Sequence, residues 1–192
     1  MAAKPNDLEL LRRCREHDPR AQKMLFDRYK EMLMGVCLRY ASDRDTAADM
    51  FQEAFIKVFS RLDQVREPAR LPGWIKRIGV TNAINHLRLK QHDFLALEAI
   101  PLDQFTDFEQ QDEAYILGKL EQAQILQLVQ SLPASQRMVF NLFALEGYSH
   151  QEIAEMLGIN EASSRVQLHR ARQALRKALL RILGKSYLDR YA

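Results

Sequence analysis

The chain has little cysteine and no motif that would bind a metal or a phosphate. Its 192 residues include 2 cysteines, Cys14 and Cys37, which stand far apart and form no Cys-x-x-Cys pair. Reduced thiols are therefore expected, rather than a disulfide or a zinc site. A Gly-rich phosphate loop and a nucleophile–base pair are also missing from the sequence. We expect a protein that is not an enzyme and that uses no cofactor and no metal.

Long apolar runs are missing as well. The N-terminus is polar and lacks the apolar core of a signal peptide, and no run approaches the length of a membrane span. With 47% hydrophobic and 28% charged residues, the chain is expected to be globular, in the cytoplasm and without membrane insertion. The formal net charge of +3 does not identify a nucleic-acid partner by itself. The distribution of the charge is more informative than its sum.

The segment from residue 148 to residue 160 predicts a short helix followed by a tight turn. Ser149 and Glu152 have the spacing of a capping box. Gly158 stands where a helix ends, and Asn160 can cap the helix that follows. A short capped helix, a glycine turn and a long basic helix form the pattern of a helix-turn-helix, whose second helix can enter the DNA major groove.

The second helix of this pattern predicts an apolar face and a basic face. The apolar residues at helical spacing are Leu168, Ala171, Leu175, Leu179 and Ile182. No Asp or Glu occurs from Ala162 to Ser186, whereas the basic residues there include Arg165, Arg170, Arg172, Arg176, Lys177, Arg181 and Lys185. A solvated face usually mixes charges of both signs, whereas a face of one sign suits a polyanion. A merely solvated basic face is the alternative.

The rest of the chain also shows helical periodicity, and no convincing strand pattern. Asp18-Pro19 predicts the start of a helix, because an N-cap is followed by proline at the first helical position. Further helices are expected at 45–62 and 73–91, with a loop at 63–72 between them. The fold class that we predict is all-α, with two small helical bundles joined by a flexible linker and a helix-turn-helix at the end of the second.

A change in composition near His92 predicts the boundary between these bundles. From Asp93 to Glu121 there are eight acidic residues and a single basic one, Lys119. A long segment with little periodicity is unusual inside one compact domain. We therefore predict a first domain at residues 1–92, an acidic linker at 93–111 and a second domain at 112–192. An ordinary solvated loop is the alternative interpretation of the linker.

Motifs in both halves resemble those of bacterial sigma factors. The second half resembles sigma region 4, on Leu132-Pro133, Arg137, Val139-Phe140, Glu146-Gly147-Tyr148-Ser149, Glu152-Ile153-Ala154, Leu157-Gly158 and Arg170-Ala171-Arg172. The first half resembles sigma region 2, on Ala47-Ala48-Asp49, Gln52-Glu53-Ala54-Phe55, Trp74-Ile75-Lys76-Arg77-Ile78, Asn82 and Leu87-Arg88. Two such regions joined by a short linker are similar to the extracytoplasmic-function (ECF) group.

This resemblance implies a function and a set of partners. A member of the group is a sigma factor that directs core RNA polymerase to promoters for transcription initiation. The implied partners are core RNA polymerase, through its β′ clamp helices and β flap, promoter DNA and an anti-sigma factor. The linker is implied to follow the path of RNA or template strand through the polymerase, where its negative charge would mimic nucleic acid.

The resemblance and the charge pattern together predict three sets of site residues. Contacts with the upstream −35 element are expected from Ser149, Ser163, Arg165, Val166, Gln167, His169, Arg170 and Arg172. Contacts with the melted −10 element are expected from Arg66, Arg70, Lys76, Arg77, Asn82, Asn85 and Arg88. The polymerase-binding residues expected on the 45–62 helix are Asp49, Gln52 and Glu53. Trp74 could stack on a base, although its spacing favours a place in the core.

Within the −35 set, different roles are expected. Arg165, His169 and Arg170 are expected at base edges, since arginine can bridge two acceptors of guanine, and Val166 at a thymine methyl group. The polar residues Ser149, Ser163, Gln167 and Arg172 are expected at phosphates. Ser164 departs from the family pattern, because it replaces an apolar core position.

Two other functions remain open at the level of sequence. A helix-turn-helix regulator would bind its DNA site independently of polymerase, usually as a dimer. A helical adaptor would bind only proteins, and the basic face from Arg165 to Lys185 would then have no use.

Overall fold

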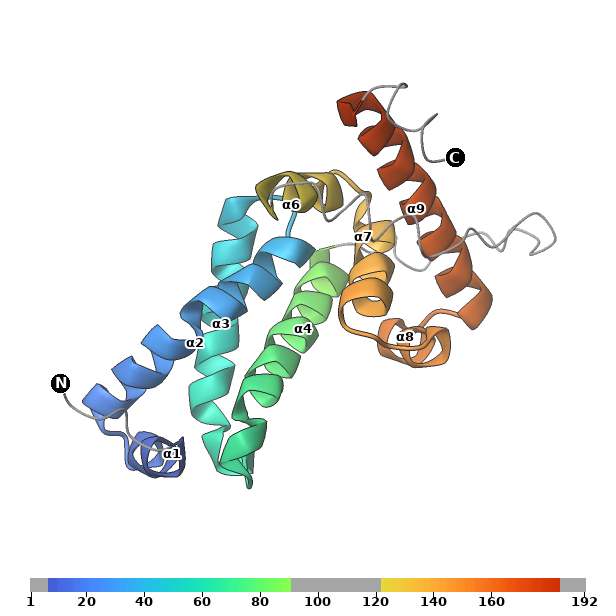
Figure 1. Cartoon of the computed structure of the whole chain (residues 1–192). Helices are drawn as coiled ribbons and strands as arrows, with labels where there is room; N and C mark the ends of the chain where they lie inside the picture. Colours follow the sequence, from blue (N-terminus) through green and yellow to red (C-terminus); the bar gives the residue numbers. More distant parts are fainter. Residues whose placement is uncertain (1–6, 91–121, 184–192) are drawn as a thin grey trace. The chain divides into compact units, whose positions relative to one another are not determined.

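A computed structural model describes residues 7–90 and 122–183, and within them all regular secondary structure is helical. The predicted all-α fold is confirmed. The chain divides into two compact units, Met1–Leu89 and Lys90–Ala192, each drawn in Figure 1. The predicted linker at 93–111 lies outside the described residues, so the domain boundaries proposed from composition stay predictions. In the described part of the chain, no helix has the length and apolar character needed to cross a membrane.

Within its described residues, unit 1 contains four α-helices and two short 3-10 turns. The helices are α1 (Asp7–Arg15), α2 (Pro19–Tyr40), α3 (Arg44–Ser60) and α4 (Leu71–Lys90). The turns η1 (Leu62–Gln64) and η2 (Pro68–Arg70) cover half of the segment expected to be a loop. The α4 helix begins two residues earlier than the sequence predicted, at Leu71.

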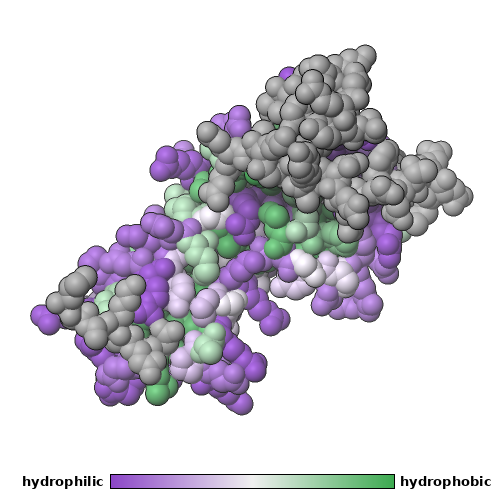
Figure 2. Space-filling model, in the orientation of Figure 1, coloured by the Kyte–Doolittle hydropathy of each residue, from purple (hydrophilic) through white to green (hydrophobic). Residues whose placement is uncertain are grey.

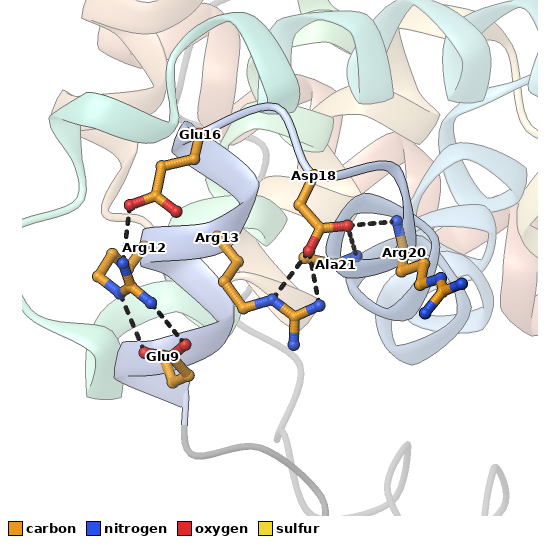
Figure 3. A network of polar contacts seen from close by, with 7 residues as sticks. All are labelled: Glu9, Arg12, Arg13, Glu16, Asp18, Arg20 and Ala21. Carbon is orange, nitrogen blue, oxygen red and sulfur yellow. Dashed lines mark hydrogen bonds and ion pairs between the residues drawn. The ribbon is translucent and has the colours of Figure 1, made fainter.

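The start of α2 has the cap that the sequence predicted. The Asp18 carboxylate accepts hydrogen bonds from the amides of Arg20 at 2.8 Å and Ala21 at 3.4 Å. Its other oxygen accepts from Arg13 Nε at 2.9 Å and Nη2 at 2.6 Å, which ties α1 to α2 (Figure 3). These bonds, led by that from Arg13, hold the pKa of Asp18 below its usual value. The Asp18-Pro19 pair therefore fixes both the start of α2 and the turn before it.

Close packing between α2 and α4 depends on Gly79. A Cβ atom at this position would lie 2.5 Å from Leu33 Cδ1, which is closer than carbon atoms can approach. The Trp74 side chain, also on α4, is half-buried and packs against the core of unit 1, in agreement with the place its spacing favours. Cys14 and Cys37 are buried and free, and burial raises the pKa of Cys37 to about 12.

The part of unit 2 that the structure describes contains four α-helices and a π-helical turn. The α-helices are α6 (Gln122–Gln130), α7 (Ala134–Phe140), α8 (His150–Leu157) and α9 (Glu161–Leu183). The π-helical turn η5 (Asn141–Leu145) extends α7. Arg137 of α7 is buried, and its Nη1 donates to the carbonyls of Gln130 at 2.7 Å and Leu132 at 3.1 Å. This side chain therefore satisfies carbonyl groups at the end of α6, which have no partner within that helix.

Few large apolar side chains are exposed in the described part of the chain. In the view of Figure 2, hydrophilic residues cover much of the surface and apolar residues appear in small patches. The most exposed large apolar side chain among the described residues is Ile56 of α3, at 69%. Scattered apolar side chains need no special explanation, but Ile56 lies beside residues predicted to bind a partner.

Candidate nucleic-acid and protein interfaces

Local hydrogen bonds shape the helix-turn-helix of unit 2. The Ser149 hydroxyl accepts from the Glu152 amide at 3.2 Å, and the Ser149 amide donates to the Glu152 carboxylate at 2.8 Å. Gly158 has the left-handed φ of 69° that ends α8. Asn160 Oδ1 accepts from the Ser163 amide at 2.6 Å and so caps α9. The capping box, the glycine stop and the second cap are all confirmed.

The Glu152 carboxylate is held in its ionised form by this cap. The backbone hydrogen bond from Ser149, followed by that from its hydroxyl, lowers the pKa of Glu152. A carboxylate at the first turn also interacts favourably with the helix dipole. The start of α8 is therefore formed by charge and hydrogen bonding together.

The α9 helix presents basic side chains to solvent along much of its length. Arg165, Arg176, Lys177 and Arg181 are exposed, while His169, Arg170 and Arg172 are half-buried. Arg165 Nη2 lies 2.5 Å from Glu161 Oε1, and its side chain keeps 54% of its surface exposed. An exposed ion pair of this kind contributes little stability, so a phosphate or a base could replace Glu161 as its partner. Lys185 lies outside the described residues.

Three of the predicted −35 residues face the core instead of solvent. Val166 is 3% exposed, Gln167 is 2% exposed and Ser163 is 6% exposed. The Gln167 amide oxygen accepts a hydrogen bond from the Ser135 hydroxyl at 3.3 Å. Because both α7 and α8 pack against α9, its first turns bury a wide face. The predictions of a thymine contact for Val166 and of phosphate contacts for Gln167 and Ser163 are therefore corrected, since these side chains pack inside unit 2.

The Ser164 hydroxyl occupies the core position that the sequence assigned to it. Ser164 is 0% exposed, and its Oγ lies 2.9 Å from His150 Nδ1, on the first residue of α8. The His150 ring stacks on Phe143 of η5 with ring centres 4.6 Å apart. Burial, followed by the positive charge of Arg165, lowers the pKa of His150. The sequence did not single out His150, and the pairing joins residues 14 positions apart.

The predicted −10 residues of unit 1 are mostly accessible. Those exposed on or just before α4 are Arg66, Arg70, Arg77, Asn85 and Arg88, while Lys76 is half-buried. Arg70 forms an exposed ion pair with Glu67 at 2.8 Å. The structure thus leaves a set of cationic side chains on the surface of η2, α4 and the segment just before η2.

Asn82 is the exception in this set. It is 1% exposed, and its Nδ2 donates to the Met50 carbonyl of α3 at 2.9 Å. Its Oδ1 accepts a hydrogen bond from Lys57 Nζ, also on α3. The prediction that Asn82 contacts a base is corrected, because its amide joins α4 to α3 inside unit 1.

The predicted polymerase-binding residues share one face of α3. Asp49, Gln52 and Glu53 are all exposed. Ile56 follows them at the spacing i, i+3, i+4 and i+7, which places the four residues on one side of the helix. Glu53 Oε1 lies 3.6 Å from Nδ1 of His86 on α4. Sequence reasoning overlooked Ile56, although its helical spacing from Asp49 was a usable signal.

Metal binding finds no support in the described part of the chain. No group of three or more His, Cys, Asp or Glu side chains there could hold an ion.

Comparisons with known families match both units. The family described as "Sigma-70 region 2" matches residues 25–92, and "Sigma-70, region 4" matches residues 122–175. The RNA polymerase sigma-H factor of Pseudomonas aeruginosa is 30% identical over 194 residues, covering 97% of this chain and 100% of that protein. The ECF RNA polymerase sigma-E factor of Escherichia coli K12 is 29% identical over 183 residues, covering 91% of this chain and 95% of that protein.

A solved structure is also similar to the chain. It contains the sigma factor RpoE in complex with the anti-sigma factor NepR from Bartonella quintana. Its sequence identity is 19%, it covers 83% of this chain and 96% of that chain, and the TM-score is 0.49.

Proposed function

The chain belongs to the sigma-70 family of RNA polymerase sigma factors, in the extracytoplasmic-function group, and we propose that its two units divide the promoter between them. It directs core RNA polymerase to promoters and catalyses no reaction itself. Unit 1 binds the polymerase and the melted −10 strand, while unit 2 reads the −35 element. The observation that carries this division is the basic surface of α9, which lies in a capped helix-turn-helix.

In unit 2, the exposed part of the −35 set supports contact with DNA. Arg165 lies in the second turn of α9, where the recognition helix of a helix-turn-helix meets base edges. His169 and Arg170 follow on α9 and are proposed for further base contacts, and Ser149 and Arg172 are proposed for contacts with phosphates. A guanidinium that bridges two acceptors of guanine contributes about 1–3 kcal/mol of discrimination.

In unit 1, the cationic side chains of η2, α4 and the segment just before η2 support contact with single-stranded DNA. Such binding needs positive charge along the strand and groups that can meet unstacked bases. The exposed arginines Arg66, Arg70, Arg77 and Arg88 supply the charge. Lys76 adds to it, and Asn85 is the exposed amide that remains for a base after Asn82 is assigned to the interior.

Polymerase docking is proposed for the face of α3 that carries Asp49, Gln52, Glu53 and Ile56. Interfaces commonly combine an apolar centre with a polar rim, and a few residues carry most of the binding energy. Ile56, at 69% exposure, supplies the apolar centre, and the three polar residues form the rim. The partner surface is the pair of β′ clamp helices, while unit 2 meets the β flap.

Two further parts of the proposal rest on membership of the family. Because core RNA polymerase works in the cytoplasm, we place the chain there. An anti-sigma factor that covers the polymerase-binding surfaces is the regulatory partner. The role of the acidic linker in guiding RNA or template strand concerns residues 93–111, outside the described part, and would be tested by replacing its carboxylates with amides and measuring abortive synthesis.

The division of labour is tested by Arg165→Ala in reconstituted holoenzyme. Selective transcription from promoters that depend on the −35 element should fall by about 5- to 150-fold, the loss of one bidentate contact. Affinity for core polymerase should be unchanged. The matched control is Arg181→Ala, an exposed arginine about 24 Å further along the same helix, with little expected effect. Loss of core binding in Arg165→Ala would contradict the division.

A further inference from the structure

His150 connects the three elements of unit 2 that meet at the helix-turn-helix. It is the first residue of α8, its Nδ1 lies 2.9 Å from Ser164 Oγ of α9, and its ring stacks on Phe143 of η5 at an interplanar angle of 23°. The guanidinium of Arg172, two turns after Ser164 on α9, lies 5.9 Å from the centre of the same Phe143 ring. Side chains of both α8 and α9 thus lie against the same aromatic ring, that of Phe143.

The hydroxyl at position 164 constrains geometry in a way that an apolar side chain would not. Ser164 is 0% exposed, so its hydroxyl cannot exchange a lost partner for water. A buried hydroxyl without a hydrogen bond costs about 1–3 kcal/mol. Apolar contacts allow a helix to slide or rotate slightly, whereas a hydrogen bond is satisfied only within a narrow range of distance and angle. The pair therefore defines how α9 is rotated against α8.

We propose that His150 and Ser164 are positioning residues for DNA reading, because their contact fixes the rotation of α9 about its own axis. Arg165 follows Ser164 directly, so its side chain leaves the helix about 100° further round. With Ser164 held on the inner side, Arg165 projects into solvent, where it is exposed. This inference rests on the proposed function of unit 2 and adds the residues that set its recognition geometry.

The charges around His150 favour the neutral ring that this contact uses. The charged groups that face it are Arg165, Arg172 and Glu161, all on α9, while its neighbour from η5 is the neutral ring of Phe143. Burial and the two guanidiniums oppose a positive charge on the ring, the Glu161 carboxylate favours it, and the balance lowers the pKa of His150. A neutral ring with its proton on Nε2 accepts the Ser164 hydroxyl at Nδ1.

Three variants of the full chain separate the hydrogen bond from the stacking. Ser164→Ala removes the hydroxyl. His150→Phe keeps an aromatic ring for Phe143 but has no ring nitrogen. His150→Asn loses the ring, while its amide occupies the place of Nδ1 and can still bond to Ser164. Thermal unfolding followed by circular dichroism establishes that each variant is folded before it is assayed.

The assay is transcription by reconstituted holoenzyme from a template library. A −10 sequence is first selected with the wild-type protein and then kept constant. The −35 element upstream of it is randomised, and the transcripts are sequenced. Ser164→Ala and His150→Phe should each reduce discrimination among −35 sequences by about 5- to 10-fold, the lower range for one bidentate base contact. The double variant should be no worse than the more affected single variant, because both remove one interaction. His150→Asn should stay within about 2-fold of wild type.

A spectroscopic readout tests the contact directly. In the full chain with ¹⁵N-labelled histidine, the Nδ1 resonance of His150 should show an unprotonated, hydrogen-bonded nitrogen near neutral pH, and it should shift in Ser164→Ala.

Several results would overturn the inference. One is a wild-type −35 preference in folded Ser164→Ala and His150→Phe. Another is an equal loss of −10 preference or of core affinity, which would indicate general damage to the fold. If the wild-type protein itself gave no promoter-directed transcripts, the proposed function would be contradicted, and so would this inference, which depends on it.

Discussion

Replacement of Asn82 by alanine separates an internal role from a DNA-binding one. The amide donates to the Met50 carbonyl at 2.9 Å and accepts from the Lys57 ammonium, in a site that is 1% exposed. Removal of the neutral bond costs about 1 kcal/mol, and removal of the bond to the charged group about 1.5 kcal/mol, since half-buried Lys57 can partly return to water. We expect Asn82→Ala to lower the free energy of unfolding of unit 1 by about 2–3 kcal/mol.

Trp74 makes this change measurable in the full chain. It is the single tryptophan of the sequence and packs against the core of unit 1. Its fluorescence during urea unfolding therefore reports unit 1 without a signal from tryptophan in unit 2. For a domain of this size, the expected destabilisation corresponds to a fall in Tm of about 10–20 °C.

Asn85→Ala is the matched control, because Asn85 is an exposed amide three residues further along α4. This variant should unfold within about 0.5 kcal/mol of wild type, while promoter melting by the holoenzyme is impaired. The structural assignment would be refuted if Asn82→Ala unfolded like wild type and instead lost −10 recognition. Asn82 would then face DNA, as the sequence alone suggested.

Three further predictions concern packing, docking and pH. Gly79→Ala should destabilise unit 1 by about 1–3 kcal/mol, because its Cβ would meet Leu33. Gly35→Ala should stabilise unit 1 by about 0.5–1 kcal/mol, because its Cβ would meet nothing within 4 Å. Urea unfolding followed by Trp74 fluorescence measures both changes, and equal effects would contradict the packing described for Gly79. Ile56→Ala should weaken binding to core polymerase by about 5- to 30-fold, as expected for an apolar anchor. Leu8→Ala changes another exposed apolar residue and should leave this affinity unchanged. A fluorescence anisotropy titration measures both affinities. The unfolding free energy of unit 2 should have its full value above pH 6.5 and should fall as the pH drops toward the lowered folded-state pKa of His150. The reason is that the unfolded chain binds more protons than the folded chain in this pH range. Urea unfolding followed by circular dichroism should show that His150→Asn removes this pH dependence.

Structural features that depend on only a few neighbouring residues could be predicted from the sequence. The Asp18-Pro19 start, the Ser149–Glu152 capping box and the Gly158 stop each depend on groups within one turn of helix. For such features the sequence contains both partners of the interaction. The helix-turn-helix is built from these local signals, and its residues alone were therefore enough to predict it.

Features that depend on distant partners could not be predicted in this way. Asn82 is polar and its helix is partly exposed, but its hydrogen-bond partners lie on α3, 32 and 25 residues away. Val166 and Gln167 were predicted to face solvent because they lie outside the clearest apolar stripe of α9. Two helices pack against α9, so its first turns bury more than one stripe. The interpretation of site residues from periodicity fails where a helix has neighbours on two sides.

The central claim is that this chain gives core RNA polymerase its choice of promoter. Run-off transcription with purified core polymerase, the full chain and a library of promoter fragments tests this claim most directly. Core polymerase alone should give no defined start site, and addition of the chain should give transcripts from discrete starts preceded by shared −35 and −10 sequences. Tight, dimeric binding of the isolated chain to DNA, with no promoter-directed transcript in the presence of core polymerase, would contradict the account.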